Sequence, residues 1–246
     1  MAGDLQQASL LRSDTPEWRL WSLVAEFAIR LGAQPWILIG GQMVALHLHL
    51  AGTTPRRTTT DVDVIADIIT SRSSFRECSA VAREMGLEPQ PSMTNQTLHR
   101  FSGPAGQLDL MVPDHLPTHL IRRLAGPKPV PIPGGQRALD RRITVNVDTE
   151  FGRAAIPLPD LVGALVLKAR AATSDSRDRH RHHTDLAQLA AIIDDPLELR
   201  RATDNKEKRY LRRVQLSDDP TTSPWLELGE RSRQRAIDAW LTLTDG

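Results

Sequence analysis

Two aspartates that stand one residue apart, Asp61 and Asp63, have the side chains and the spacing for metal chemistry. They lie in residues 57–67, where valine and isoleucine predict a β-strand. On a strand, residues i and i+2 project from the same face, so we expect the two carboxylates side by side. Carboxylate oxygens are the hard ligands that Mg²⁺ prefers. Alone, an Asp-x-Asp pattern is more typical of a turn or a strand end, so the metal hypothesis depends on its surroundings.

A glycine pair upstream supplies the first support for this hypothesis. Gly40 and Gly41 close an apolar, strand-like run over residues 36–39, and a helix is expected over residues 42–50. Glycines at a strand end let backbone N–H groups approach phosphate oxygens closely. The helix N-terminus that follows adds a favourable partial positive charge.

A third carboxylate, Asp109, lies in a predicted strand over residues 107–112. Gln107, Asp109 and Met111 share one face, and the apolar residues between them share the other, as in a half-buried antiparallel strand. We therefore expect Asp109 to meet Asp61 and Asp63. Three carboxylates near a glycine turn suit nucleotidyl transfer, in which two Mg²⁺ ions hold a triphosphate and lower the pKa of the attacking hydroxyl.

The elements that must position these residues form an α/β (α+β) fold, a mixed β-sheet flanked by helices and followed by a helical C-terminal region. The spacing of apolar residues predicts helices over residues 17–31 and 73–85, strands over 98–101 and 107–112, and a strand pair over 143–156. Residues 126–135 are rich in proline and glycine and read as an irregular loop. Helices are expected over 160–172, 184–193, 196–214 and 223–243. This change of character places a domain boundary near residue 156, between a core at 1–156 and a helical region at 157–246.

The motifs resemble those of the DNA polymerase β-like nucleotidyltransferase superfamily. The resemblance rests on Gly40-Gly41, Thr60-Asp61-Val62-Asp63-Val64 and Leu108-Asp109-Leu110. Within the superfamily the chain is most similar to the abortive-infection AbiEii type of toxin, because Leu167-Lys168-Ala169-Arg170 and Asp185-Leu186 follow in a helical region. The similarity covers roughly residues 34–195.

The resemblance implies an enzyme that transfers a nucleoside monophosphate from a nucleoside triphosphate to a hydroxyl of RNA, tRNA in particular, or of a protein. It also implies a cognate antitoxin. Asp61, Asp63 and Asp109 would bind two Mg²⁺ ions, or Mn²⁺, and Lys168 would neutralise charge on the triphosphate. The residues implied to bind the nucleotide are Gly40, Gly41, Thr60, Arg57, Lys168 and Asp185.

Two positions depart from the family pattern. Gly41 stands where many superfamily members have a serine, and His182 stands where relatives often have the first of two aspartates, which leaves Asp185 alone. Other readings also remain open for the basic residues. Lys168 can be a surface lysine whose stem covers apolar surface, and Arg56 and Arg57 can belong to a charged loop.

Residues 177–183 contain three histidines and three arginines. Histidines this close together, without a cysteine or a distant partner, rarely complete a zinc tetrahedron. We expect the run either to contact phosphate or RNA backbone, or to form a solvated loop that leads into a helix capped by Thr184.

The composition sets the remaining limits. The 246 residues are 40% hydrophobic and 25% charged, which is typical of a folded domain, and the net charge of +1 neither requires nor excludes nucleic acid. Residues 115–147 carry six basic residues and one acidic residue, a local +5 that is compatible with RNA or with a solvated loop. A lone Cys78 forms no internal disulfide. The first residues lack a positive stretch followed by an apolar core, and no apolar run approaches the ~20 residues of a membrane span, so we expect a cytoplasmic protein without membrane contact.

Two other functions compete with the toxin hypothesis. A small-molecule nucleotidyltransferase of the aminoglycoside type shares the same carboxylates but favours an acidic cleft over a basic rim. A nucleotide-binding or partner-binding module without catalysis is the other alternative, and the retention of all three carboxylates weakens it.

Overall fold

The computed structural model describes residues 6–9, 16–32, 35–90, 97–117, 120, 128–175 and 178–245. The chain divides into two compact units. The first comprises Met1–Met43 and Thr58–Pro159, and the second comprises Val44–Arg57 and Asp160–Gly246. The domain boundary that the sequence analysis places near residue 156 stays a prediction. No helix in the described part of the chain is long and apolar enough to cross a membrane.

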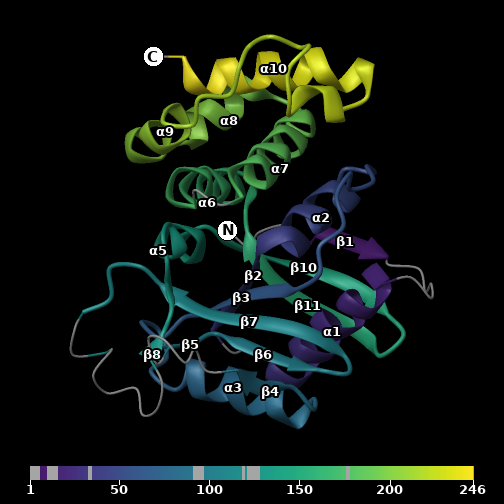
Figure 1. The fold of residues 1–246 in the computed structure, drawn as a ribbon, viewed down its shortest axis with the longest axis vertical. Coiled ribbons are helices and arrows are strands. Elements are labelled where there is room, and N and C mark those ends of the chain that lie inside the picture. Colours follow the sequence, from purple (N-terminus) through teal and green to yellow (C-terminus); the bar gives the residue numbers. More distant parts are fainter. Residues whose placement is uncertain are drawn as a thin grey trace. The chain divides into compact units, whose positions relative to one another are not determined.

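The main sheet of the first unit is mixed, as the sequence predicts (Figure 1). Its order is β2-β3-β7-β6-β4, with β9 pairing β7 outside this path. The two central strands, β3 and β7, are parallel, and the other pairs on the path are antiparallel. The strands are β2 (Trp36–Ile39), β3 (Val62–Ala66), β4 (Glu88–Gln90), β6 (Arg100–Gly103), β7 (Gly106–Pro113) and β9 (Pro131–Ile132).

Helices α1 (Pro16–Leu31) and α3 (Ser74–Glu84) contact each other and strands β3 and β7 (Figure 1). On α1, apolar residues at three-to-four spacing form the buried stripe that amphipathicity predicts. One of them, Phe27, meets Trp36 of β2 edge-to-face, with ring centroids 5.2 Å apart. Both predicted helices are confirmed, and their packing fixes β3 and β7 as buried central strands.

A second sheet in this unit contains β1 (Gln6–Ser9), β10 (Arg142–Thr149) and β11 (Gly152–Pro159). Strands β10 and β11 form the antiparallel pair predicted over residues 143–156 and extend it by three residues at the C-terminal end. The prediction of an irregular segment over 126–135 is wrong in its described part. There β8 (Lys128–Pro129) pairs β5 (Thr97–Leu98), β9 pairs β7, and α5 (Gly135–Asp140) begins. Proline has no N–H to donate, but it is tolerated in such short strands at a sheet edge.

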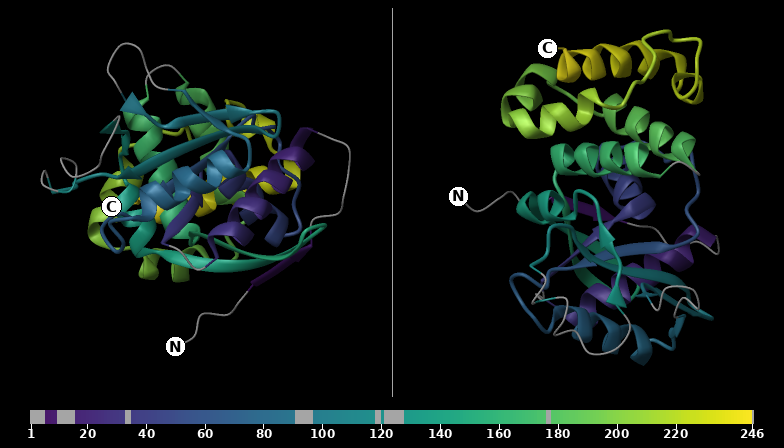
Figure 2. Two further views of the ribbon diagram at one scale, coloured as in Figure 1. Left: turned by 90° about the horizontal axis from the view of Figure 1, so that it is seen from below. Right: turned by 60° about the vertical axis from the view of Figure 1, so that its left-hand side comes forward.

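The second unit is helical (Figure 2, green to yellow). Helix α6 packs against α7, and α10 contacts α7, α8 and α9. The second unit also includes the C-terminal part of α2 (Gly40–Leu50), from Val44 onward, whereas the start of α2 belongs to the first unit. Its other helices are α6 (Leu161–Ser174), α7 (Arg179–Ala191), α8 (Pro196–Ala202), α9 (Asn205–Arg212), the 3₁₀ helix η1 (Trp225–Glu227) and α10 (Glu230–Thr244).

Three helix predictions for this unit differ from the structure by more than two residues. Residues 196–214 form two helices, because Asp204 caps a new one. The last helix begins at Glu230, after η1, and not at residue 223. Helix α7 begins at Arg179, so the histidine run is helical and Thr184 is an interior residue, not a cap. The Thr184 hydroxyl donates to Glu227 Oε1 at 3.2 Å, which satisfies it inside the helix.

Candidate active site

Strand pairing brings the three predicted carboxylates together. The parallel register of β3 and β7 sets Asp63 opposite Asp109, and Asp61 directly precedes β3. One oxygen from each of Asp61, Asp63 and Asp109 lies within 4.8 Å of the others. Asp109 is buried, and the two remaining aspartates are half-buried. The prediction that these side chains converge is confirmed, although β7 is antiparallel only to β6.

The donor set fits a divalent cation. Three carboxylates this close repel one another, and a bound cation would offset that repulsion. All donors are hard oxygens, which suit Mg²⁺ or Mn²⁺ better than softer metals. The Thr59 hydroxyl donates to Asp61 Oδ1 at 3.1 Å and helps to orient that side chain. The site can therefore hold such an ion.

Gly40 lies directly against one of these carboxylates. Helix α2 starts at Gly40, two residues earlier than predicted, so the glycine pair forms its first turn. Gly40 has φ +70°, and a Cβ built there would lie 1.9 Å from Asp63 Oδ2. The position therefore requires glycine twice, for its backbone conformation and for the space that Asp63 occupies.

Arg100 is a site residue that the sequence reasoning missed. It stands opposite Asp109 in the antiparallel pair of β6 and β7. Its Nε donates to Asp109 Oδ1 at 3.0 Å and its Nη2 donates to Oδ2 at 2.8 Å. The hydrogen bonds to Asp109, with the nearby charges of Asp61 and Asp63, raise the pKa of Arg100. The tight turn from Gly103 to Gly106 fixes this register, so pairing the two predicted strands across that turn would have found the contact.

The second unit holds a separate buried group of charges. Lys168 Nζ donates to Asp185 Oδ2 at 2.6 Å, and Arg57 Nη2 lies 3.3 Å from the same oxygen. The side chains of Lys168 and Asp185 are only 6% and 2% exposed. Burial by itself would raise the pKa of Asp185, but the charges of Lys168 and Arg57 hold it below its usual value. Lys168 is thus no surface lysine, and Arg57 is paired with a carboxylate.

His182 lies on α7, three residues before Asp185. Burial, together with the charges of Lys168 and Arg181, lowers its pKa to about 4. His182 therefore carries a neutral ring near pH 7.

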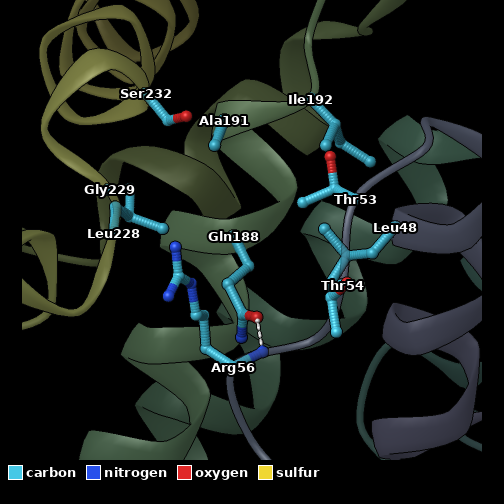
Figure 3. A pocket seen from close by; sticks show the side chains of 10 residues that line it. All are labelled: Leu48, Thr53, Thr54, Arg56, Gln188, Ala191, Ile192, Leu228, Gly229 and Ser232. Atoms are coloured by element: carbon cyan, nitrogen blue, oxygen red, sulfur yellow. Dashed lines mark hydrogen bonds between the residues drawn. The ribbon is translucent and has the colours of Figure 1, made fainter.

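Arg56 and Thr60 are exposed. The Arg56 backbone N–H donates to Gln188 Oε1 at 2.7 Å, beside a small pocket within the second unit (Figure 3). Leu48, Thr53, Thr54, Arg56, Gln188, Ala191, Ile192, Leu228, Gly229 and Ser232 line this pocket. The basic stretch over 115–147 lies partly outside the described residues, including Arg122 and Arg123.

Comparison with known families agrees with the geometry. A family model described as the nucleotidyl transferase AbiEii toxin of the type IV toxin–antitoxin system matches residues 21–242. No curated protein and no solved structure matches the chain.

Proposed function

The chain belongs to the AbiEii family of nucleotidyl transferase toxins, and we propose that it moves a nucleoside monophosphate from a nucleoside triphosphate to a hydroxyl of RNA or protein. The acceptor oxygen forms a bond to the α-phosphorus while the bond to the leaving pyrophosphate breaks, and the proton of the acceptor hydroxyl passes to solvent. We propose tRNA as the first acceptor to test and a cognate antitoxin as the partner. The observation that carries the proposal is the convergence of Asp61, Asp63 and Asp109 within 4.8 Å.

Asp61, Asp63 and Asp109 are the residues that would hold Mg²⁺ or Mn²⁺. When bound, such an ion supplies positive charge to the triphosphate and lowers the pKa of a coordinated hydroxyl. The chain contributes rigidity, because Asp63 lies on a central strand paired on both sides, to Ile39 and to Asp109. Fixed ligands need little rearrangement during the reaction, which is how a preorganised site lowers a barrier.

The glycine pair and the buried lysine have separate proposed roles. Gly40 and Gly41 open α2, whose first backbone N–H groups are free of partners within the helix and suit phosphate oxygens. Thr60 directly precedes the paired carboxylates and is proposed to contact the nucleotide. Lys168 is proposed to neutralise triphosphate charge, with Asp185, itself held by Arg57, orienting its ammonium group.

Asp109 is proposed as a ligand, and as a base only after a rearrangement. Both of its oxygens already accept N–H donors from Arg100. To take a proton from an acceptor hydroxyl, Asp109 would need one of these hydrogen bonds released. The structure thus favours the ligand role over the base role.

Asp63→Asn tests the proposal directly. The purified protein is incubated with each labelled nucleoside triphosphate, Mg²⁺ and, separately, a tRNA pool, cell protein or aminoglycosides. We expect label in tRNA or protein with the wild type, and transfer reduced at least about 100-fold in Asp63→Asn, because a ligand charge is lost. Asp140→Asn makes the same change at an exposed residue of α5 and should leave transfer unchanged.

Each alternative gives a different result in this assay. Label confined to aminoglycosides favours a small-molecule enzyme. Bound nucleotide without transfer to any acceptor favours a binding module. Undiminished turnover in Asp63→Asn would remove the carboxylates from the mechanism.

A further inference from the structure

The contact between Arg100 and Asp109 has an arrangement that a simple surface ion pair lacks. Two N–H groups of the guanidinium meet the two oxygens of one carboxylate, at 3.0 and 2.8 Å, in the fork geometry that only arginine provides. The Asp109 side chain is 9% exposed, whereas that of Arg100 is 43% exposed. A partly exposed cation therefore holds a buried carboxylate of the candidate metal site.

The position of this cation matches the electrostatic need of the site. Asp61, Asp63 and Asp109 bring three negative charges within 4.8 Å, and a folded protein must offset their repulsion before any ion arrives. Arg100 supplies one positive charge through a residue that β-sheet register fixes opposite Asp109. An incoming divalent ion needs an oxygen of Asp109, so it must share or displace one of the two hydrogen bonds.

A neighbour offers the displaced guanidinium another acceptor. Gln107 stands two residues before Asp109 on the same face of β7. With its amide oxygen turned toward Arg100, that oxygen lies 3.1 Å from Nε and 3.2 Å from Nη2. The same two N–H groups thus have a second acceptor while they bind Asp109, and Gln107 can keep them hydrogen-bonded when an ion takes an oxygen of Asp109.

We propose that Arg100 is a positioning residue that stands in for the metal: it holds Asp109 toward Asp63 before metal binds and competes with the ion for the Asp109 carboxylate. This inference rests on the proposed function, because it requires that Asp109 is a metal ligand. Its consequence is that Arg100 lowers metal affinity while it stabilises the metal-free protein. A purely structural strand-crossing ion pair would stabilise the protein equally with and without metal.

Manganese binding separates the two roles. Free Mn²⁺ is measured by electron paramagnetic resonance during titration of the wild type, Arg100→Gln, Arg100→Lys and Arg142→Gln. We expect Arg100→Gln to bind Mn²⁺ about 10-fold more tightly, because the repulsion between the guanidinium and the incoming cation, and their competition for Asp109, are gone. Arg100→Lys keeps the charge without the fork and should fall between the two. Arg142→Gln removes an exposed strand arginine of the same unit and should change affinity less than twofold.

Thermal unfolding supplies a second readout on the same proteins. In chelator, Arg100→Gln should melt below the wild type, and saturating Mn²⁺ should shrink that difference because the variant binds the ion more tightly. If Arg100→Gln does not fold, Arg100→Lys carries the same test.

The outcomes distinguish this inference from the proposed function. Wild-type binding with unchanged or weaker affinity in Arg100→Gln overturns the competition alone. The same melting difference with and without Mn²⁺ reduces Arg100 to a structural ion pair and also overturns it. A wild type that binds no more Mn²⁺ than Asp63→Asn overturns the metal site, and this inference with it.

Discussion

At the scale of single residues, the position of the Asp63 side chain depends on the absence of a side chain at Gly40. The Asp63 carboxylate can lie beside Asp109 only because Gly40 has no side chain, since a Cβ there would overlap Asp63. The usual reading of a glycine in such a motif is close approach of phosphate to the backbone. Here the same glycine also makes room for a protein carboxylate, so its replacement should disturb the site even when no nucleotide is present.

Gly40→Ala should therefore weaken Mn²⁺ binding as well as stability. Its φ of +70° costs a non-glycine residue about 1–2 kcal/mol, and the added methyl would overlap Asp63. Gly86→Ala is the matched control, since Gly86 has φ +78° with no atom within 4 Å of a Cβ. Urea unfolding should show a loss in both variants, larger in Gly40→Ala, and Mn²⁺ titration should show a loss in Gly40→Ala only. Equal behaviour of the two variants would contradict the contact.

The carboxylates were predictable from local sequence patterns alone, and their basic partners were not. The i, i+2 spacing of Asp61 and Asp63 and the alternation around Asp109 are local patterns that strand geometry converts directly into position. Arg100 and the pairing of Lys168 with Asp185 depend on which segments become neighbours. For Arg100 a hairpin register carries that information, but Lys168 and Asp185 meet through packing of α6 on α7, which no local pattern encodes.

At the scale of elements, the sequence predicts the long helices and the central strands well and the short elements poorly. Helix α1 has apolar residues at helical spacing along its sixteen residues, and β2 is a short, fully buried apolar run that a glycine pair closes. Strands β8 and β9 contain two residues each and exist only because β5 and β7 offer them edges. The break between α8 and α9 was readable, because Asp204 and Glu207 have the spacing of a capping box.

Asp204→Ala tests how far that break depends on its cap. The Asp204 side chain accepts hydrogen bonds from the backbone N–H groups of Lys206 and Glu207. In return, the Asp204 backbone N–H donates to the Glu207 carboxylate. Losing the cap should lower the free energy of unfolding by about 1 kcal/mol, measured by urea denaturation with circular dichroism. Asp218→Ala, at an exposed residue outside any helix, should change it by less than about 0.5 kcal/mol. Equal effects of the two substitutions would show that Asp204 does not stabilise the start of α9.

At the scale of the whole molecule, the buried charges of the second unit couple folding to pH. Lys168 and Arg57 lower the pKa of Asp185, so the stability that this carboxylate gives is present above its unfolded pKa and is lost only in acid. Positive charges disfavour the protonated form of His182. Burial is the largest cause, followed by the charges of Lys168 and Arg181, and together they lower the pKa of His182 in the folded state. The two residues therefore affect stability in different pH ranges.

Global stability should fall between pH 6.5 and about 4 because of His182. In this range the unfolded chain binds a proton at His182 with a pKa of 6.5, whereas the folded protein binds it only near pH 4. The loss should be of the order of 2 kcal/mol, less than the full shift implies, because part of the charge is screened by solvent. We expect urea unfolding at pH 7.5, 6, 5 and 4.5 to show this decline in the wild type and a flatter profile in His182→Gln. His49 and His183, whose pKa values burial also lowers, remain in both proteins and leave a residual slope. Parallel profiles for the two proteins would show that His182 is not the group that makes folding sensitive to mild acid.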